Sequence, residues 1–394
     1  MSIRFVTKRN LWKTLLVVFL LAFAALTLLV AAEWTYIQRL RNQPRYPRTG
    51  IEWYRPTETV PGAITTTSLP KAKQKDIHFR PEALSNAVHY AEAGGAAAFL
   101  VIQDGKIISE EYGIGRGPDS RTDSASMMKT VVALLIGIAI HEGNIKDADE
   151  PASNYLPEWA KDERRKITIR NLLQMHSGLR PEGKYDDPFS DACYLAMGTN
   201  LRYVVRNIPL TGEPGAHYDY NDVNYQALGF ILEHATGQRF ASYLSEKLWK
   251  PLGNADAMVW LDKEEGEART FGYLFATAHD WARVGLLILN EGRENNSQIV
   301  PAEWIHEMRL SSPSEPTYGA GIYLGPDNPE NPPFLATDCL VLNGYGKQRV
   351  YIIPSHKLII VRIGERPPKW NDSFLPNMLV SGLVDSVSSE KRKE

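Results

Sequence analysis

The chain has 394 residues, of which 43% are hydrophobic and 10% aromatic, so its composition is that of a globular protein with a sizeable core. Its 44 Lys and Arg residues nearly balance 46 Asp and Glu residues, for a net charge of −2. Without a basic excess or a nucleic-acid-binding motif, we expect no nucleic-acid partner. The two cysteines, Cys193 and Cys339, are too few for a disulfide scaffold, and the sequence leaves open whether they pair.

The N-terminus departs from the composition of a soluble protein. Residues 1–13 are basic, and residues 14–32 form an uncharged run of about 19 residues, close to the roughly 20 needed to span a bilayer. Because basic flanks stay inside, residues 1–13 are predicted to be cytoplasmic. We therefore expect a single-pass signal anchor in the inner (cytoplasmic) membrane, with the remaining chain in the periplasm or at the cell exterior. Cleavage after "VAA", before Glu33, is the alternative.

Residues 33–75 contain five prolines and little apolar periodicity, which predicts an extended Pro-rich linker or a wrapping arm. We expect the folded domain over residues 76–388 and a charged tail over 389–394. The apolar runs "AAAFLVIQ" and "KIISEEYG" are joined by Asp104-Gly105, a combination that predicts a β-hairpin.

A helix is predicted over residues 125–141, and because it is apolar on nearly every face it should be buried. Residues 150–310 show mostly helical patterns. Three β patterns follow, "DCLVLNG", "QRVYIIP" and "HKLIIVRIG", and then a terminal helix near 371–387. Strands at both ends with helices between them indicate an α/β (α+β) fold, in which helices and a helical subdomain flank one central antiparallel sheet.

The pattern Ser-x-x-Lys occurs three times, beginning at Ser68, Ser126 and Ser388. Only Ser126 stands at the start of a predicted buried helix, where residues i and i+3 share a face and Lys129 reaches the serine hydroxyl. A lysine held out of water can activate such a hydroxyl as a nucleophile, and the helix N-terminus favours an oxyanion. The alternative is that Ser124 or Ser126 caps the helix and that Lys129 points to solvent.

Residues 76 to about 385 resemble the serine β-lactamase and penicillin-binding-protein superfamily. They most resemble its class C-like branch, which includes family VIII esterases, D-aminopeptidases and 6-aminohexanoate-dimer hydrolases. The resemblance rests on seven sequence segments that occur in the same order as in the family. The resemblance implies a β-lactamase/transpeptidase-like fold. The segments include "DSASMMKT", "ITIRNLLQMHSGL", "PGAHYDYNDVNYQALGFILEHATGQ" and "GYGKQRVYIIPSHKLIIVRIG".

The resemblance assigns the nucleophile to Ser126 and its partner to Lys129. The Tyr-x-Asn motif of the family falls on Tyr220, which is expected to accept a proton as a phenolate or through Lys129, while Tyr185 begins a competing Tyr-x-Asp. Asp222 stands where the family has asparagine, and because a carboxylate only accepts hydrogen bonds, this replacement weakens the case for a β-lactam substrate. The resemblance makes Asp222 and Tyr185 candidate substrate-binding residues.

The third motif of the family falls near residues 344–348, and the binding residues expected there are Tyr345, Gly346 and Gln348. Tyr345 takes the place of a Lys or His, so the motif lacks its cation unless Lys347 or Arg349 supplies it. Glycines allow a strand edge to approach a substrate closely. We expect a backbone N–H near Gln348 to complete the oxyanion hole with that of Ser126.

These patterns predict a membrane-anchored serine hydrolase that cleaves a small-molecule ester or linear amide through an acyl-enzyme on Ser126. No cofactor or metal is expected, because the sequence has no Cys/His cluster, phosphate loop or dinucleotide fingerprint. The alternative is a slowly acylating or non-catalytic penicillin-binding or sensor protein on the same fold. His176, His217 and His279 could in principle serve a Ser-His-Asp hydrolase. Such a hydrolase is expected to carry a Gly-x-Ser-x-Gly motif, which this sequence lacks. The sequence does not indicate the oligomeric state.

Overall fold

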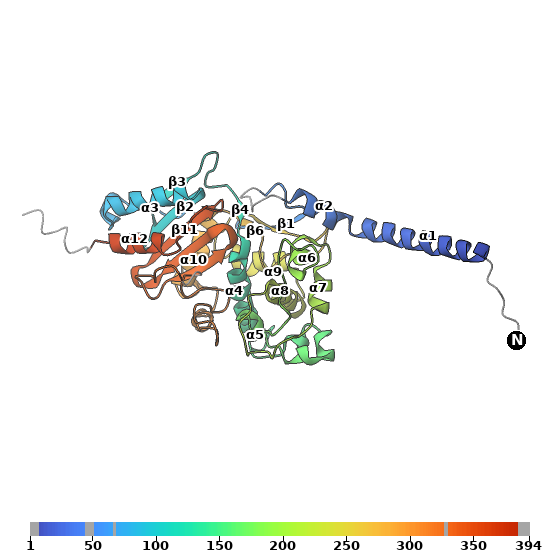
Figure 1. The fold of residues 1–394 in the computed structure, drawn as a ribbon. Coiled ribbons are helices and arrows are strands. Elements are labelled where there is room, and N and C mark those ends of the chain that lie inside the picture. Colours follow the sequence, from blue (N-terminus) through green and yellow to red (C-terminus); the bar gives the residue numbers. More distant parts are fainter. Residues whose placement is uncertain (1–7, 44–50, 66–67, 327–329, 385–394) are drawn as a thin grey trace, which may run out of the picture.

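The computed structural model describes residues 8–43, 51–65, 68–326 and 330–384. Its centre is a five-stranded sheet with helices on both faces, beside a mostly helical region (Figure 1). The mixed architecture expected from the sequence is confirmed. The predicted tail at 389–394 and the first seven residues lie outside the described part of the chain.

The five-stranded sheet joins the two ends of the domain. Its order is β3-β2-β11-β10-β9, and every neighbouring pair is antiparallel. The predicted hairpin is present: Asp104 and Gly105 both have positive φ, 49° and 73°, which suits a two-residue turn between twisted strands. The strands are β2 (Ala96–Gln103), β3 (Lys106–Tyr112), β9 (Leu340–Gly344), β10 (Gln348–Ile353) and β11 (Leu358–Gly364).

Each face of this sheet is covered by helices from distant parts of the sequence. Phe99 and Val101 face α3 (Pro81–Ala93) and α12 (Phe374–Gly382), whereas Leu100 and Ile102 belong to the core shared with α4 (Met128–His141) and α10 (Ala278–Leu289). This alternation follows from the period of two along a strand. Because both faces of the inner strands are buried, β2 and β11 are apolar without strict alternation, whereas the edge strand β3 carries polar residues.

Helix α4 is the core helix that the sequence predicts, and residues 128–139 are all buried. It packs against α8 (Asp222–Thr236) of the helical region and against α11 (Ala302–Met308). The other helices of that region are α5 (Ile169–Leu173), α6 (Asp191–Met197), α7 (Leu201–Asn207) and α9 (Phe240–Leu244). Helix α4 therefore connects the sheet with the helical region, and its N-terminus lies where the two meet.

The interpretation of residues 33–75 as a linker is wrong, and the wrapping arm describes this segment better. It contains α2 (Trp34–Asn42), which packs on α6, and β1 (Thr57–Val60), which pairs with β5 (Ala257–Trp260). Strand β1 is the first strand of a second sheet, of order β1-β5-β6-β4, with β6 (Leu274–Ala276) and β4 (Thr122–Asp123). Isolated aromatic side chains of this segment are buried against other elements. The folded part therefore begins before residue 76.

Helix α1 (Lys8–Ala32) extends away from the domain (Figure 1). Its 21 residues Trp12–Ala32 are apolar and exposed, and their length and composition suit a membrane-spanning or signal segment. The helix begins before the predicted start of the apolar run at residue 14 and covers all of it.

Cys193 and Cys339 are both free and buried, and they belong to different hydrophobic clusters. The pairing that the sequence left open is therefore not formed in this structure.

Candidate active site

A tight turn presents Ser126 at the N-terminal end of the core helix. The turn runs from β4 through the single 3₁₀ turn Ala125–Met127 into α4. Ala125 has a positive φ of 45°, an uncommon conformation for a residue with a side chain, and its N–H donates to Asp123 Oδ1 at 2.9 Å. Strain of this kind clusters at functional sites.

The capping alternative does not describe this turn. Ser124 accepts a hydrogen bond from the N–H of Leu274 at 3.0 Å, so its hydroxyl fixes the second sheet to the turn. Neither the 3₁₀ turn nor α4 has a side-chain cap at its start. Lys129, which the alternative places in solvent, is only 2% exposed.

Lys129 lies at the centre of the site. Its Nζ donates to Ser126 Oγ at 3.0 Å and to the carbonyl oxygen of Phe271 at 2.8 Å, and it pairs with Asp222 Oδ1 at 2.6 Å. A buried ammonium needs such partners, because it has lost its hydration. The spacing of three residues on one helix face thus brings Lys129 to the serine hydroxyl, as expected for that spacing.

Tyr220 lies beside Ser126 and Lys129. The Lys129 Nζ is 5.0 Å from the centroid of the Tyr220 ring, and the phenol is within hydrogen-bond reach of Ser126. Burial, followed by the Asp222 charge, raises the pKa of Tyr220 well above its usual range, although the Ser126 contact opposes this. Tyr220 is therefore a neutral phenol in the resting protein, which argues against the phenolate alternative.

Asp222 is the first residue of α8, and both of its carboxylate oxygens have partners. Oδ1 pairs with Lys129, and Oδ2 accepts a hydrogen bond from the hydroxyl of Tyr185. The backbone N–H of Asp222 donates to Glu182 Oε2 at 2.8 Å. The Asp222 carboxylate and the Tyr185 phenol thus bind each other in this structure, and the substrate-binding role of the two residues stays a prediction.

Glu182 brings a second carboxyl group close to this centre. Burial, followed by the Asp222 charge, raises the pKa of Glu182 well above its usual range. Glu182 therefore keeps its proton in the folded protein at pH values where the unfolded chain has released it. Since this group then binds more protons in the folded state than in the unfolded state, its contribution to stability falls as the pH rises above about 5, the ordinary carboxyl range.

Replacing Glu182 with Gln tests this effect. The amide resembles the protonated carboxyl, so we expect the melting temperature of Glu182→Gln to fall less between pH 5 and pH 8 than that of the parent chain. Calorimetry at four or five pH values measures the difference. Glu163→Gln, which changes an exposed carboxylate paired with Lys166, is the control. Parallel curves for Glu182→Gln and the parent would contradict the assignment.

The edge strand β9 borders the nucleophile turn on its other side. A Cβ added to Gly344 would lie 2.4 Å from the carbonyl oxygen of Ser124, so only glycine allows this approach. Of the residues predicted to bind substrate here, Tyr345 is 55% exposed and accepts a hydrogen bond from Arg366, and Gly346 lies in the following turn with φ 75°. Gly344, at the end of the strand, makes the close approach to the Ser126 turn, and the turn Tyr345–Lys347 packs beside it.

Gln348 begins β10 opposite Gly344, but its side chain is committed elsewhere. Its amide donates to the carbonyl oxygen of Gly364 at 2.7 Å and accepts from the N–H of Gly364 at 2.9 Å. The oxyanion-hole role of a backbone N–H near Gln348 stays a prediction.

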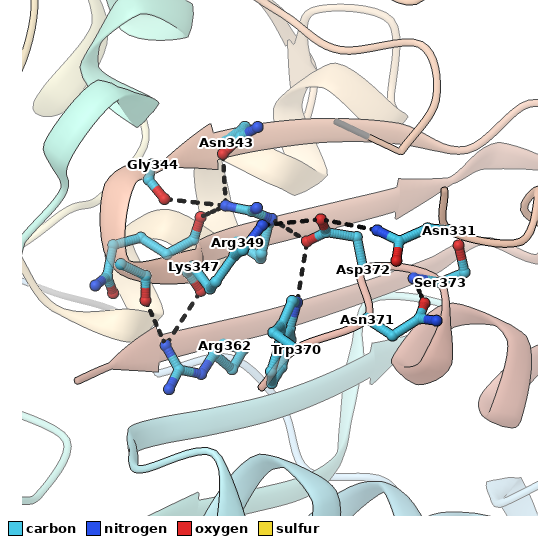
Figure 2. Close-up of polar contacts among 12 residues, drawn as sticks. Asn331, Asn343, Gly344, Lys347, Arg349, Arg362, Trp370, Asn371, Asp372 and Ser373 are labelled. Atoms are coloured by element: carbon cyan, nitrogen blue, oxygen red, sulfur yellow. Dashed lines mark hydrogen bonds and ion pairs between the residues drawn. The ribbon is translucent and has the colours of Figure 1, made fainter. Parts of the chain in front are cut away.

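Neither Lys347 nor Arg349 supplies the cation that the third motif lacks. Both pair with Asp372, at 3.1 and 2.8 Å, and Arg349 also donates to the carbonyl oxygen of Gly344 at 3.0 Å (Figure 2). On the neighbouring strand, Arg362 donates to the carbonyl oxygens of Gly346 and Lys347 (Figure 2). The two buried arginines thus hold the end of β9 and the turn that follows it.

Sequence reasoning missed two members of the site. The Phe271 carbonyl is a backbone group in a segment without a motif, so no residue type marks it. Glu182 precedes the competing Tyr-x-Asp motif by three residues, and its contact with Asp222 depends on how the loop folds.

The Ser-His-Asp alternative gains no support from the histidine contacts. His176 bonds to Ser312 and Ser314, and His279 bonds to Glu110.

A serine at a strained helix start, a buried lysine on its hydroxyl and a glycine strand edge beside it define a serine-nucleophile hydrolase. The comparisons with known proteins agree. The β-lactamase family model matches residues 85–373, and the chain belongs to that family.

The curated relatives are named as hydrolases. The 6-aminohexanoate-dimer hydrolase of Paenarthrobacter ureafaciens is 28% identical over 54% of this chain, and the match spans 56% of that hydrolase. A Salmonella typhimurium protein proposed to be a D-alanyl-D-alanine carboxypeptidase is 22% identical over 73% of this chain and 83% of its own length.

Among solved structures, a Bacillus anthracis protein proposed to be a 6-aminohexanoate-dimer hydrolase superposes with a TM-score of 0.71. The two are 21% identical, and the match covers 88% of this chain and 94% of that one. The likeness establishes the fold.

Proposed function

We propose that the protein hydrolyses an ester or a linear amide through an acyl-enzyme on Ser126. The observation that carries this proposal is the buried contact between Lys129 Nζ and Ser126 Oγ, at 3.0 Å. A lysine excluded from water beside a serine hydroxyl has no evident structural purpose that a smaller apolar residue would not serve better.

The reaction proceeds in two acyl-transfer steps. Ser126 Oγ attacks the substrate carbonyl, and the Tyr220 oxygen takes up the hydroxyl proton as the phenol passes its own proton to the leaving group. The positively charged Lys129 stabilises the negative charge that develops between them, and the ester or amide bond breaks. The developing oxyanion is held by the backbone N–H of Ser126 and by one from the strand edge near residues 344–348. Water then attacks the acyl-enzyme, and the same groups return a proton to Ser126.

Asp222 favours esters and linear amides over β-lactams. The asparagine of the family motif can donate to a substrate carbonyl, whereas both oxygens of Asp222 are occupied by Lys129 and Tyr185. The exposed Tyr345 adds no positive charge for a carboxylate. The activity for which the Paenarthrobacter relative is named supports a linear amide as the substrate.

The apolar helix α1 supports anchoring of the enzyme in the inner membrane. The basic residues that flank the apolar run on its N-terminal side favour a cytoplasmic N-terminus. The catalytic domain would then lie in the periplasm or at the cell exterior. Cleavage before Glu33 would release the domain.

The alternative function is a penicillin-binding or sensor protein that acylates slowly on the same serine. Both functions use the same arrangement of active-site residues. The departures from the family motifs at Asp222 and Tyr345 keep this alternative open. The two differ in turnover: a hydrolase releases the acyl group, whereas a sensor retains it.

Intact-mass measurement of the purified protein, incubated with short-chain esters, linear amides and β-lactams, tests the proposal. We expect steady product release from at least one ester or amide, with a transient mass increase equal to the acyl group. A persistent adduct without turnover would support the sensor, and no adduct with any compound would contradict both.

A further inference from the structure

We propose that α2, the helix that follows the apolar anchor, positions the active-site loop 182–190 through the hydroxyl of Tyr36. Tyr36 is then a positioning residue for the hydrolysis proposed above, on which this inference rests. It lies outside residues 85–373 that match the family.

Helix α2 is joined to α1 without a flexible connection. The backbone N–H of Glu33 donates to the carbonyl oxygen of Leu29 at 3.0 Å, and the N–H of Ile37 donates to that of Glu33 at 3.0 Å. Glu33, with φ −95° and ψ 13°, thus ends the hydrogen-bond ladder of α1 and begins that of α2, so a single residue joins the two helices. The end of the apolar helix therefore sets where α2 begins.

Arg39 fixes α2 to the catalytic domain. Its guanidinium is buried, lies 5.2 Å from the ring centre of Trp260, and donates to the carbonyl oxygens of Met197 and Gly198, each at 3.0 Å. These carbonyls end α6, where a helix lacks internal donors and its dipole attracts a cation. Helix α2 is thereby held at the C-terminal end of α6.

Tyr36 connects α2 to the loop that precedes α6. Its hydroxyl is part of a buried side chain and donates to the carbonyl oxygen of Pro188 at 2.6 Å. The next residue, Phe189, is 96% exposed, so its ring does not hold this end of the loop. Within the loop, Ser190 Oγ donates to the carbonyl oxygens of Lys184 and Asp187, so the Tyr36 hydrogen bond is the contact that ties this turn to α2.

The other end of the loop reaches the catalytic lysine. Tyr185 donates to Asp222, whose second oxygen pairs with Lys129. Pro188 and Tyr185 are three residues apart, so a displacement at Pro188 is transmitted to the Tyr185 phenol over a short length of backbone. The contacts run from Tyr36 through the loop to Asp222 and Lys129.

A second contact links the same arm to the nucleophile turn. The Tyr54 hydroxyl lies 3.3 Å from Asp123 Oδ2, and Asp123 Oδ1 holds the strained N–H of Ala125. The arm therefore supports the site from two directions, which is the arrangement expected if the membrane-side segment positions the catalytic groups.

The test compares Tyr36→Phe with Tyr194→Phe in the full chain in detergent micelles. Both variants remove one phenol hydroxyl from the same aromatic cluster, whose rings lie 5.1 Å apart, but the Tyr194 hydroxyl contacts Glu33 instead of the loop. We expect Tyr36→Phe to raise hydrogen exchange in residues 182–190 about fivefold, the effect of one lost hydrogen bond, and Tyr194→Phe to leave it unchanged. Unchanged exchange in Tyr36→Phe overturns the proposal, whether or not the protein turns over substrate.

Turnover provides the second measurement. We expect Tyr36→Phe to lower kcat about fivefold with KM unchanged, and to have no further effect in a chain that already carries Tyr185→Phe. Independent, additive effects of the two substitutions would overturn the coupling through the loop. If the unmodified chain neither acylates nor turns over any compound, the proposed function fails, and loop exchange alone decides this inference.

Discussion

Ser126→Ala is expected to abolish hydrolysis, lowering kcat by at least about 10⁴-fold, because no other group replaces the attacking oxygen. Labelling by a fluorophosphonate probe and the acyl-enzyme mass should disappear together. The fold should remain, since Lys129 keeps its partners Asp222 and Phe271. Turnover of a short-chain activated ester, measured with the melting temperature, separates loss of chemistry from loss of structure.

Ser68→Ala is the matched control. Ser68 begins another Ser-x-x-Lys pattern, but it is exposed and lies in the arm rather than at a helix start. Its replacement should leave both turnover and probe labelling unchanged. Activity of Ser126→Ala within tenfold of the parent chain would contradict the assignment of the nucleophile.

The sheet, the core helix and the contact between Ser126 and Lys129 could be predicted because local patterns determine them. Asp104-Gly105 specifies a turn wherever it occurs between strands, and the apolar residues of α4 require burial on all sides. Ser126 and Lys129 are three residues apart on one helix, so their contact follows from helix geometry alone. Tyr220 was placed only through the family resemblance.

What the sequence did not reveal depends on contacts between distant segments. The arm has no hydrophobic period, because α2 and β1 bury single side chains such as Tyr36 and Tyr54 instead of a regular face. The third motif was expected over residues 344–348, and within it Gly344, at the end of β9, makes the close approach to the Ser126 turn. Gly344 and Gly346 could each allow a close approach, and only the register of β9 with β10 decides between them.

Asp372 explains why Lys347 and Arg349 were misleading as substrate cations. The residue lies far along the sequence from the strand edge and carries no motif, yet it is 2% exposed and binds both side chains. A lysine and an arginine beside a glycine strand edge suggest anion binding until their carboxylate partner is seen. The charge of this cluster is therefore a structural feature of the sheet.

Asp372→Ala is accordingly expected to lower the free energy of unfolding by about 3–5 kcal/mol, the usual cost of leaving a buried charge without its partner. Arg349 is 1% exposed and faces Arg362 across the strand pair, so the repulsion between them would no longer be offset. Denaturant titration of the full chain in detergent measures the loss. Glu163→Ala, at an exposed pair with Arg165, should change stability by less than about 1 kcal/mol. A loss of that small size in Asp372→Ala would contradict the argument.

Removing both charges separates the stabilising role of this pair from its effect on the site. In the double variant Arg349→Met with Asp372→Leu, the buried pair is gone and only Lys347, whose side chain is 29% exposed, loses a partner, so most of the lost stability should return. Turnover should nevertheless be low in the double variant, because Arg349 also donates to the carbonyl oxygen of Gly344, at 3.0 Å, and so fixes the end of β9 against the Ser126 turn. Full activity in the double variant would show that β9 keeps its position without the guanidinium. Recovered stability with low activity would show that the sheet tolerates an apolar pair while the strand edge needs the hydrogen bond.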